Sequence, residues 1–457
     1  MRSDLRVADN PALAAAAERG SVVAVYLAAP AQWSSHGVGA NRRAFALRTL
    51  SELSRAFSAL NIPLLIRTVS RFADHPAAIV RLAKACAADA VMCNEEYPLD
   101  ERRRDGAAQA LCNDAAIEFH RFSGGVVLAP GQVLTADGKP YTVFTPFKRR
   151  WLASVDDGAL QPIETPKRQR KIDVPGDPTP KRMGGASADR LAELWPGGEA
   201  EAMRRLDAFI SGGLRRYHSD RDRPDREGTS RLSAYLAIGA ISARQCIAAA
   251  RERNGGQLGS GDVGATTWIS ELIWREFYAH VTAAFPDISR GRAFRPVNDR
   301  VRWRDDPEGF AAWREGRTGY PLVDAAMRQL AATGWMHNRL RMLTAMFLTK
   351  HLLIDWRLGE RHFMDLLVDG DFAANNGGWQ WSASTGTDAA PYFRIFNPVT
   401  QAKKFDPDGA FVRRWVPELA ATPKSAIFEP WRAGPSRYPP PIVDHASARE
   451  RALLAWR

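Results

Sequence analysis

The chain has 457 residues, 45% of them hydrophobic and 25% charged, which is typical of a globular protein with two or three domains. Its 63 basic and 51 acidic side chains give a net charge of +12, and a basic balance favours polyanionic partners such as nucleic acids. The sequence has no apolar run of about 18 residues and no export signal, so we expect no membrane span and a cytoplasmic protein. The four cysteines lack metal-ligand spacing, and no metal site is expected.

The first 130 residues alternate between apolar, strand-like runs and amphipathic, helix-like runs. Strands are predicted at 21–29, 63–69, 90–94 and 126–129, and helices at 40–61, 76–88 and 99–115. This alternation predicts an α/β domain over residues 1–130 with a parallel, doubly wound sheet. The segment has no GxGxxG motif, so the sequence does not support dinucleotide binding of the common Rossmann kind.

The rest of the chain changes character twice. Residues 131–205 are rich in proline, glycine and charge, which predicts a long interdomain linker. Residues 206–457 show helical periodicity in one segment after another, as at 266–285, 320–332 and 338–350. We therefore expect an all-α domain over residues 206–457.

Tryptophan is concentrated in this helical part of the chain. Eleven of the fourteen tryptophans lie at or after Trp268, and residues 377–381 read Gly-Gly-Trp-Gln-Trp. Aromatic packing explains most tryptophans in proteins, but it gives no reason for this asymmetry. An aromatic cofactor, stacked bases or an electron relay would explain it.

A helix start with free hydroxyl groups follows Gly228. Thr229 and Ser230 precede an apolar helical run, and such a start offers backbone N–H groups and hydroxyls to a phosphate. An ordinary capped helix would give the same pattern, so this segment alone does not decide between the two interpretations.

Two predicted helices carry polar groups beside aromatic or sulfur-containing ones. The first has one face made of Trp268, Glu271, Arg275 and Tyr278. A carboxyl group among tryptophans and arginines suits base recognition. The second has an amide, a guanidinium and a thioether on one side, from Asn338, Arg341 and Met342. These three side chains suit the wall of a binding pocket.

Segments 271–278, 335–342 and 369–388 resemble the signature blocks of the photolyase/cryptochrome family, in particular bacterial class I cyclobutane pyrimidine dimer photolyases. The resemblance extends from Asp4 to the proline-rich tail at 439–441. It implies a Rossmann-like amino-terminal domain and a helical domain that binds FAD, used as FADH⁻. The implied activity is light-driven repair of pyrimidine dimers in DNA by electron transfer, carried out by a monomer.

The family's functional positions can be carried over one by one. Those around the flavin are Tyr217, Thr229, Ser230, Arg231, Leu232, Ser233, Trp268, Asn338, Arg341, Asp369, Gly370, Asp371 and Asn375. Those toward the lesion and the DNA are Arg221, Glu271, Trp274, Arg275, Tyr278, Asn338, Arg339, Met342, Trp381 and Gln401. The resemblance makes Glu271 and Asn338 the catalytic candidates in the lesion pocket. It also implies an electron relay from the flavin to the surface through Trp379, Trp356 and Trp303.

Two of these positions have implied roles that depend on protonation. Asn375 corresponds to the residue that faces flavin N5, where a neutral amide cannot readily deliver a proton. Glu271 is expected to be protonated, because burial against tryptophan raises the pKa of a carboxyl group. A protonated Glu271 could donate a hydrogen bond to a thymine carbonyl.

The start of the chain departs from the family pattern. The family opens with an apolar strand before Asp-Leu-Arg, whereas here Met1 to Ser3 stand directly before Asp4. We therefore expect a sheet without its first strand, and a start codon further upstream.

The antenna positions also depart from the pattern. Some relatives bind 5,10-methenyltetrahydrofolate as a light-harvesting antenna, and His36 and Glu101 match positions that hold it. Asp100 stands where these relatives have asparagine, and Ser289-Arg290 replaces their Cys-Lys pair. The resemblance therefore implies a folate antenna at His36, Asp100 and Glu101 with only part of its usual ligand set.

Three other functions compete with dimer repair. A cryptochrome-type blue-light photoreceptor would share the flavin site, but it is expected to carry a regulatory tail that this sequence does not show. A (6-4) photolyase would have a second histidine where Asn338 follows His337. A nucleic-acid-binding module without catalysis would not need a flavin site.

Overall fold

The computed structural model describes residues 1–296, 299, 301–433 and 437–456, which form two compact units. The first, here called the α/β unit, comprises residues 1–215, 230–289 and 368–373. The second, the helical unit, comprises residues 216–229, 290–367 and 374–457. Because the chain passes between the units several times, each unit is built from segments that are distant in the sequence.

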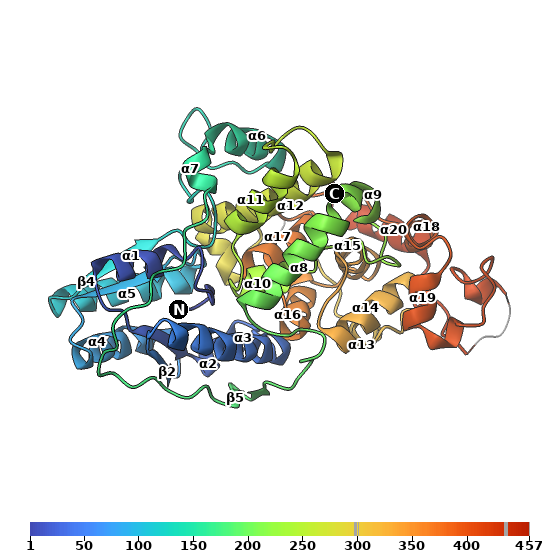
Figure 1. Cartoon of the computed structure of the whole chain (residues 1–457). Coiled ribbons are helices and arrows are strands. Elements are labelled where there is room, and N and C mark those ends of the chain that lie inside the picture. The colour runs from blue at the N-terminus through green and yellow to red at the C-terminus, as the bar shows by residue number, and fades with distance from the viewer. Residues whose placement is uncertain (297–298, 300, 434–436, 457) are drawn as a thin grey trace. The chain divides into compact units, whose positions relative to one another are not determined.

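The α/β unit contains two parallel pairs of strands (Figure 1). Strand β1 (Ala24–Ala28) pairs with β2 (Leu64–Thr68), and β3 (Ala90–Asn94) pairs with β4 (Glu118–Phe122). The first three strands confirm the predicted ones, and the predicted parallel direction is also confirmed. No ladder joins β1 to β3 within the described part of the chain, so the strands form two small sheets instead of one.

The amino-terminal residues contact both small sheets. The Met1 ammonium group donates to the carbonyl of Val25 in β1 at 2.9 Å, and the Arg2 guanidinium donates to the carbonyl of Asn94 at the end of β3. Residues 1–10 form neither helix nor strand. Among the described residues, no strand before β1 belongs to either small sheet, as expected.

The strand predicted at 126–129 is wrong. The fourth strand is β4, whose residues Glu118 to Phe122 are too polar to have been recognised as a strand. Val126, Val127 and Leu128 are buried, which explains their apolar character, but they do not belong to a sheet. Val127 and Leu128 instead donate their backbone N–H groups to the buried carboxylate of Glu276.

The helices predicted in the first 130 residues are confirmed within a few positions, as α3 (Ala40–Ala59), α4 (His75–Ala85) and α5 (Leu99–Asp114). Helix α3 buries a stripe that includes Phe45 and Phe57, the pattern of a helix covering a sheet. The α/β unit has further helices at α1 (Pro11–Arg19), α2 (Pro30–Ser35), α8 (Glu199–Gly212), α10 (Ser233–Ala237), α11 (Ala243–Arg253) and α12 (Val263–Ala284). The segment 131–205 contains α6 (Phe144–Ser154), α7 (Asp157–Leu160) and the two-residue strands β5 (Arg182–Met183) and β6 (Ala186–Ser187).

All regular elements described in residues 206–457 are helical, as predicted. Those in the helical unit are α9 (Tyr217–Asp220), α13 (Pro307–Glu315), α14 (Pro321–Thr333), α15 (Asn338–Met346), α16 (Trp356–Leu366), α18 (Pro398–Phe405), α19 (Ala410–Trp415) and α20 (His445–Ala455). Helix α17 (Phe372–Ala383) belongs to this unit from residue 374 onward. The helix predicted at 338–350 is α15 continued by a π-helical turn at Phe347–His351.

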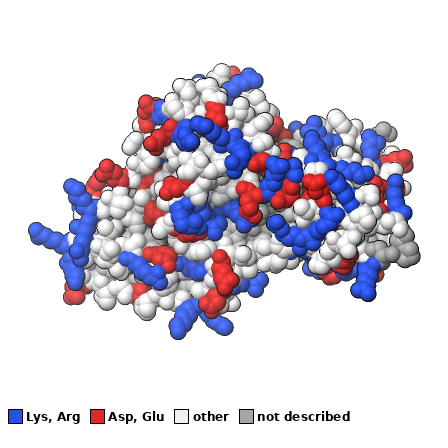
Figure 2. Space-filling model, turned by 45° about the vertical axis from the view of Figure 1, so that its right-hand side comes forward, with Lys and Arg blue, Asp and Glu red and all other residues white. Residues whose placement is uncertain are grey.

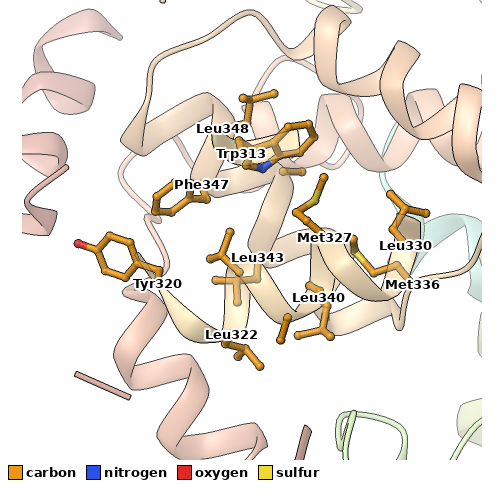
Figure 3. Packing of buried hydrophobic residues seen from close by; sticks show 14 of the residues in the cluster. Trp313, Tyr320, Leu322, Met327, Leu330, Met336, Leu340, Leu343, Phe347 and Leu348 are labelled. Atoms are coloured by element: carbon orange, nitrogen blue, oxygen red, sulfur yellow. The ribbon is translucent and has the colours of Figure 1, made fainter. Parts of the chain in front are cut away.

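The core of the helical unit is a single apolar cluster around Trp313, with Trp356, Trp379 and Phe363 among its buried members. Helices α14 and α15 contribute Leu and Met side chains that pack beneath Trp313 and beside Phe347 (Figure 3). The Trp313 indole N–H donates to the carbonyl of Thr344 at 3.0 Å, so its polar atom is satisfied in the apolar surroundings. Among the described residues, no helix is both long and apolar enough to cross a membrane.

Candidate functional site

Helix α12 carries the predicted base-recognition face of the α/β unit. The helix is capped by Asp262, whose carboxylate accepts the backbone N–H of Ala265. Trp274 stacks on Phe144 of α6, with centroids 3.7 Å apart and planes at 10°. Glu271 and Tyr278 are half-buried, and the Trp274 and Tyr278 rings are 5.6 Å apart. One face of Trp274 is therefore already covered by an aromatic ring.

Two other predicted residues of α12 are held by neighbours within the α/β unit. Trp268 is 3% exposed and packs against Phe209. The Arg275 guanidinium donates to the carbonyls of Gly125 and Leu236. Because these bonds use the Arg275 guanidinium, its first role in the unit is to connect α12 to the loop at Gly125 and to helix α10.

The predicted phosphate-binding residues of the α/β unit lie before and at the start of α10. Leu232 is buried and precedes the helix, while Ser233 begins it and is exposed. The Ser230 hydroxyl accepts the backbone N–H of Leu232 at 3.5 Å. Arg231 has a positive φ of 51°, which turns the backbone sharply between the hydroxyl groups and the helix.

The segment 368–373 brings three more predicted flavin residues into the α/β unit. Asp369 is 6% exposed, and the carbonyl of Gly370 accepts a hydrogen bond from the Arg42 guanidinium. Asp371 lines a cavity together with Arg42 and Arg275. Acidic and basic side chains thus face the same space inside this unit.

In the helical unit, α15 presents the predicted pocket residues. The helix is capped by His337, whose Nδ1 accepts the backbone N–H of Arg339 at 3.2 Å. Burial lowers the pKa of His337 to about 4, so this side chain is neutral at physiological pH. Asn338, Arg341 and Met342 follow at one-turn spacing, and the Arg341 Nε donates to the carbonyl of Met336 at 2.8 Å.

The predicted DNA-contacting arginines of the helical unit already have partners. Arg339 forms an ion pair with Asp222 at 2.9 Å, and its guanidinium lies 4.6 Å from the centroid of the Phe405 ring. The guanidinium of Arg221 lies 5.5 Å from the ring centroid of Tyr217, which is itself a predicted flavin residue and is 9% exposed. Thr229 is half-buried in the same unit.

Helix α17 orders a set of amide groups. The Asn375 amide donates to the carbonyl of Glu360 at 3.1 Å, and the Asn376 amide donates to the carboxylate of Glu360 at 3.0 Å. Gln380 donates in turn to Asn376 at 2.9 Å. Asn375 is therefore fixed by its amide N–H, and it offers no acidic proton.

The three tryptophans of the predicted relay belong to one part of the helical unit. Trp356 is 0% and Trp379 is 2% exposed, and both are members of the apolar cluster, while half-buried Trp303 packs against it. Trp379 packs edge-on against Phe363 and Trp313. A β-carbon on Gly359 would come within 2.1 Å of the Trp379 ring, so glycine is needed at this position for the indole to fit. Trp381, two residues after Trp379, is half-buried.

The predicted antenna residues His36 and Glu101 line a cavity of the α/β unit, and Asp100 contacts His36. The His36 Nε2 lies 3.1 Å from Asp100 and its Nδ1 lies 3.7 Å from Glu101, while its ring packs edge-on against Phe72. His36, Phe72 and Glu101 line the cavity. Burial, reinforced by the neighbouring Glu96, raises the pKa of Glu101 to about 8, and its Oε2 atom has no hydrogen-bond partner among the described residues.

Sequence reasoning missed one buried carboxylate on the central helix of the α/β unit. Glu276 is 0% exposed, and it accepts hydrogen bonds from the backbone of Val127 and Leu128 and from the Trp151 indole at 2.7 Å. Burial raises the pKa of Glu276, and these three donors offset only part of the effect. No sequence signal links residues 127, 151 and 276, because only the fold brings them together.

Basic and acidic side chains are interspersed over the face of the molecule that Figure 2 shows. Many arginines on the described surface are already in ion pairs, such as Arg55 with Glu52 and Arg204 with Glu201. The net charge of +12 is therefore a small excess of basic side chains on a surface that carries charges of both signs.

Comparison with known proteins agrees with this arrangement. Residues 1–167 match the family model for DNA photolyase, and residues 268–457 match the FAD binding domain of DNA photolyase. The chain is 46% identical to a deoxyribodipyrimidine photo-lyase of Vibrio cholerae, covering 100% of this chain and 98% of that protein. The chain therefore belongs to the DNA photolyase family.

Solved structures of this family share the fold. A bacterial class III photolyase from Agrobacterium tumefaciens superimposes with a TM-score of 0.91 at 37% identity, covering 100% of this chain and 96% of that one. A cryptochrome of Synechocystis superimposes with a TM-score of 0.84 at 27% identity, covering 100% and 98%. The higher identities to photolyases favour photolyase activity over the photoreceptor alternative.

Proposed function

We propose that this protein repairs cyclobutane pyrimidine dimers in DNA, using light and a reduced FAD. The observation that carries the proposal is the set of three tryptophans in and against one apolar cluster, within a domain of the photolyase FAD-binding type. A photoreceptor would share this set, but the relative that matches the full chain at 46% identity is a deoxyribodipyrimidine photo-lyase. The cytoplasm is the proposed place of action, and a monomer is the proposed working form.

The donor groups of both units suit FAD chemically. In the α/β unit, Ser230, Arg231 and Ser233 offer hydroxyl and guanidinium donors of the kind that a pyrophosphate accepts. In the helical unit, the Asn375 amide, fixed by Glu360, provides a neutral hydrogen-bonding group for a flavin ring. FAD supplies the light absorption and the single electron that splits the dimer.

The protein residues then have separate tasks. In the α/β unit, Glu271 is proposed to donate a hydrogen bond to the lesion, and Trp274 to provide a stacking surface worth about 1–3 kcal/mol per base. In the helical unit, Asn338, Met342 and Trp381 are proposed to contact the lesion, and Gln401 to lie toward the DNA. The damaged bases must leave the duplex to be reached, which costs a few kcal/mol and costs less where pairing is already weak.

The first experiment measures cofactor binding and repair separately. Purified protein is incubated with FAD and examined for the visible absorption band of bound flavin, and dimer loss in irradiated oligothymidylate is then followed under blue light. Glu271→Ala should leave flavin content unchanged and lower the repair yield by about tenfold, as expected for one lost hydrogen bond of about 1.4 kcal/mol. Glu252→Ala, which alters an exposed glutamate of α11, serves as the control. Folded protein that binds no flavin would refute the proposed function.

The relay is tested through photoreduction of the flavin. Trp379→Phe should block photoreduction of the oxidised flavin, because phenylalanine is much harder to oxidise than tryptophan. Repair by chemically pre-reduced protein should persist in this variant, since the relay only restores the reduced cofactor. Normal photoreduction in Trp379→Phe would exclude this residue from the relay.

We also propose that the cavity beside Glu101 binds a folate antenna. The support is the buried Oε2 atom of Glu101, which can meet the N–H groups of a pterin. Titration with 5,10-methenyltetrahydrofolate measures the affinity, and Asp100→Asn, which restores the residue of folate-binding relatives, should raise it. Equal and negligible binding by the wild type and this variant would show that the cavity holds no folate.

A further inference from the structure

Trp456, directly after helix α20, lies beside Trp303 in the helical unit. The two ring centroids are 5.5 Å apart and the planes meet at 81°. This edge-to-face arrangement brings the two π systems into direct contact. Both indoles are half-buried. Trp456 thus extends the set of tryptophans that begins with Trp379 in the apolar cluster.

Lys350 holds Trp456 in place. Its Nζ atom lies 3.3 Å from the centroid of the Trp456 ring. The same Nζ donates to the Ala383 carbonyl at 3.2 Å and to the Ser384 hydroxyl at 3.0 Å. These two acceptors lie at the end of α17, the helix that carries Trp379. The indole of Trp456 is therefore positioned by a fixed group of the helical unit, although it lies near the end of a helix.

The charge of Lys350 does not oppose oxidation of this indole. A protonated amine against the ring would favour the neutral indole and make the loss of an electron harder. Burial without a carboxylate partner lowers the pKa of Lys350 to about 6, so the amine is mostly neutral above that pH. The Trp456 indole nitrogen is buried, with no acceptor among the described residues, so an oxidised indole has no adjacent base at that atom.

We propose that Trp456 is a fourth electron donor, which reduces oxidised Trp303 and extends the relay by one residue. The proposal rests on the relay described under the proposed function. In that relay Trp379 would be the first electron donor when oxidised flavin is bound and excited by light, and Trp356 and then Trp303 would each donate one electron in turn. One electron then moves from Trp456 to the Trp303 radical cation. No bond forms or breaks, Trp303 becomes neutral, and Trp456 becomes the radical cation. An added thiol restores Trp456 by giving one electron.

Transient absorption of FAD-loaded protein, without thiol, tests this step. The lifetime of the tryptophan radical should fall several-fold in Trp456→Phe, because a vacancy confined to Trp303 lies closer to the flavin and recombines faster. Trp431→Phe alters another partly buried tryptophan packed against the same cluster, and it should behave as the wild type.

A second variant gives a signal that does not depend on whether the substitution disturbs packing around position 456. In Trp456→Tyr, the electron paramagnetic resonance signal after illumination should change from that of a tryptophan radical to that of a tyrosyl radical. Peptide mass spectrometry after long illumination without thiol should find oxidation at Trp456 in the wild type.

The possible failures can be told apart. Equal radical lifetimes in the wild type and Trp456→Phe, with a shortened lifetime in Trp303→Phe, would overturn the fourth donor and leave the three-residue relay intact. Unchanged photoreduction in Trp379→Phe would instead overturn the relay itself.

Discussion

The interiors of the two units are built from different chemistry. The α/β unit buries charged and amide side chains, including Arg6, Asp9, Asn94, Arg104 and Asp105. The helical unit buries aromatic side chains and holds nine of the fourteen tryptophans. Buried charges are tolerated only when each has partners, whereas an aromatic core gains stability from apolar area alone. The comparison predicts that polar changes will damage the first unit and volume changes the second.

Arg6 illustrates how the α/β unit satisfies a buried charge. Its side chain is 1% exposed and donates to the carbonyls of Asp9, Gly124 and Gly239. These bonds join the amino-terminal segment to two distant loops. In the helical unit, Lys350 gives a contrast, because it is 0% exposed and its hydrogen-bond partners are neutral.

The largest effect is expected in the aromatic core. Trp313→Ala should lower the free energy of unfolding by about 3–5 kcal/mol, because it removes a fully buried indole and leaves a cavity. Urea denaturation measures the change, and Trp313→Phe should cost less because it keeps most of the volume. A loss below about 1 kcal/mol for Trp313→Ala would mean that the cluster can collapse around the gap.

The next effect tests the polar interior of the α/β unit. Arg6→Met should destabilise the protein by about 3 kcal/mol, although methionine replaces the aliphatic part of the side chain, because three buried carbonyls lose their donor. Arg6→Lys should be intermediate, since one ammonium group cannot reproduce the fork of a guanidinium. If Arg6→Met unfolds at the same urea concentration as the wild type, the contrast between the two interiors does not hold.

The last prediction has the smallest effect per pH unit, because it concerns the pH dependence that Lys350 gives to stability. Because burial lowers its pKa to about 6 in the folded state, the unfolded chain binds more protons at this site between pH 6 and the ordinary lysine value. The stability of the wild type should therefore rise with pH across this window, by up to about 1.4 kcal/mol per pH unit. Lys350→Met lacks this dependence. Urea denaturation of both proteins at several pH values gives the difference, and parallel curves would show that Lys350 stays protonated.

Much of the fold follows from local sequence patterns. The strands at β1, β2 and β3 and helices α3 to α5 are visible as apolar runs and amphipathic periodicity, since each presents an apolar face to the same core. Strand β4 is not visible, because three of its five side chains are polar and none is fully buried. Its identity depends on pairing with β3, which is a long-range contact.

For the candidate site, the sequence named some of the residues and missed others. The resemblance named Trp379, Trp356 and Trp303 in advance, and the structure places them in or against one cluster. It also named His36, Asp100 and Glu101; both carboxylates contact His36, and His36 and Glu101 line one cavity of the α/β unit. Lys350 and Trp456 carried no sequence signal, because residues 106 positions apart give no hint of contact.

The sequence by itself determined the class of fold and the family, and it named the candidate residues for the chemistry. These depend on local periodicity and on motifs, which are properties of short segments. Only the tertiary structure decided which carbonyls Arg6 satisfies, which backbone groups Glu276 accepts and which indole lies beside Trp303. Those contacts join segments far apart in the chain, and their energies arise only when folding removes water from between them.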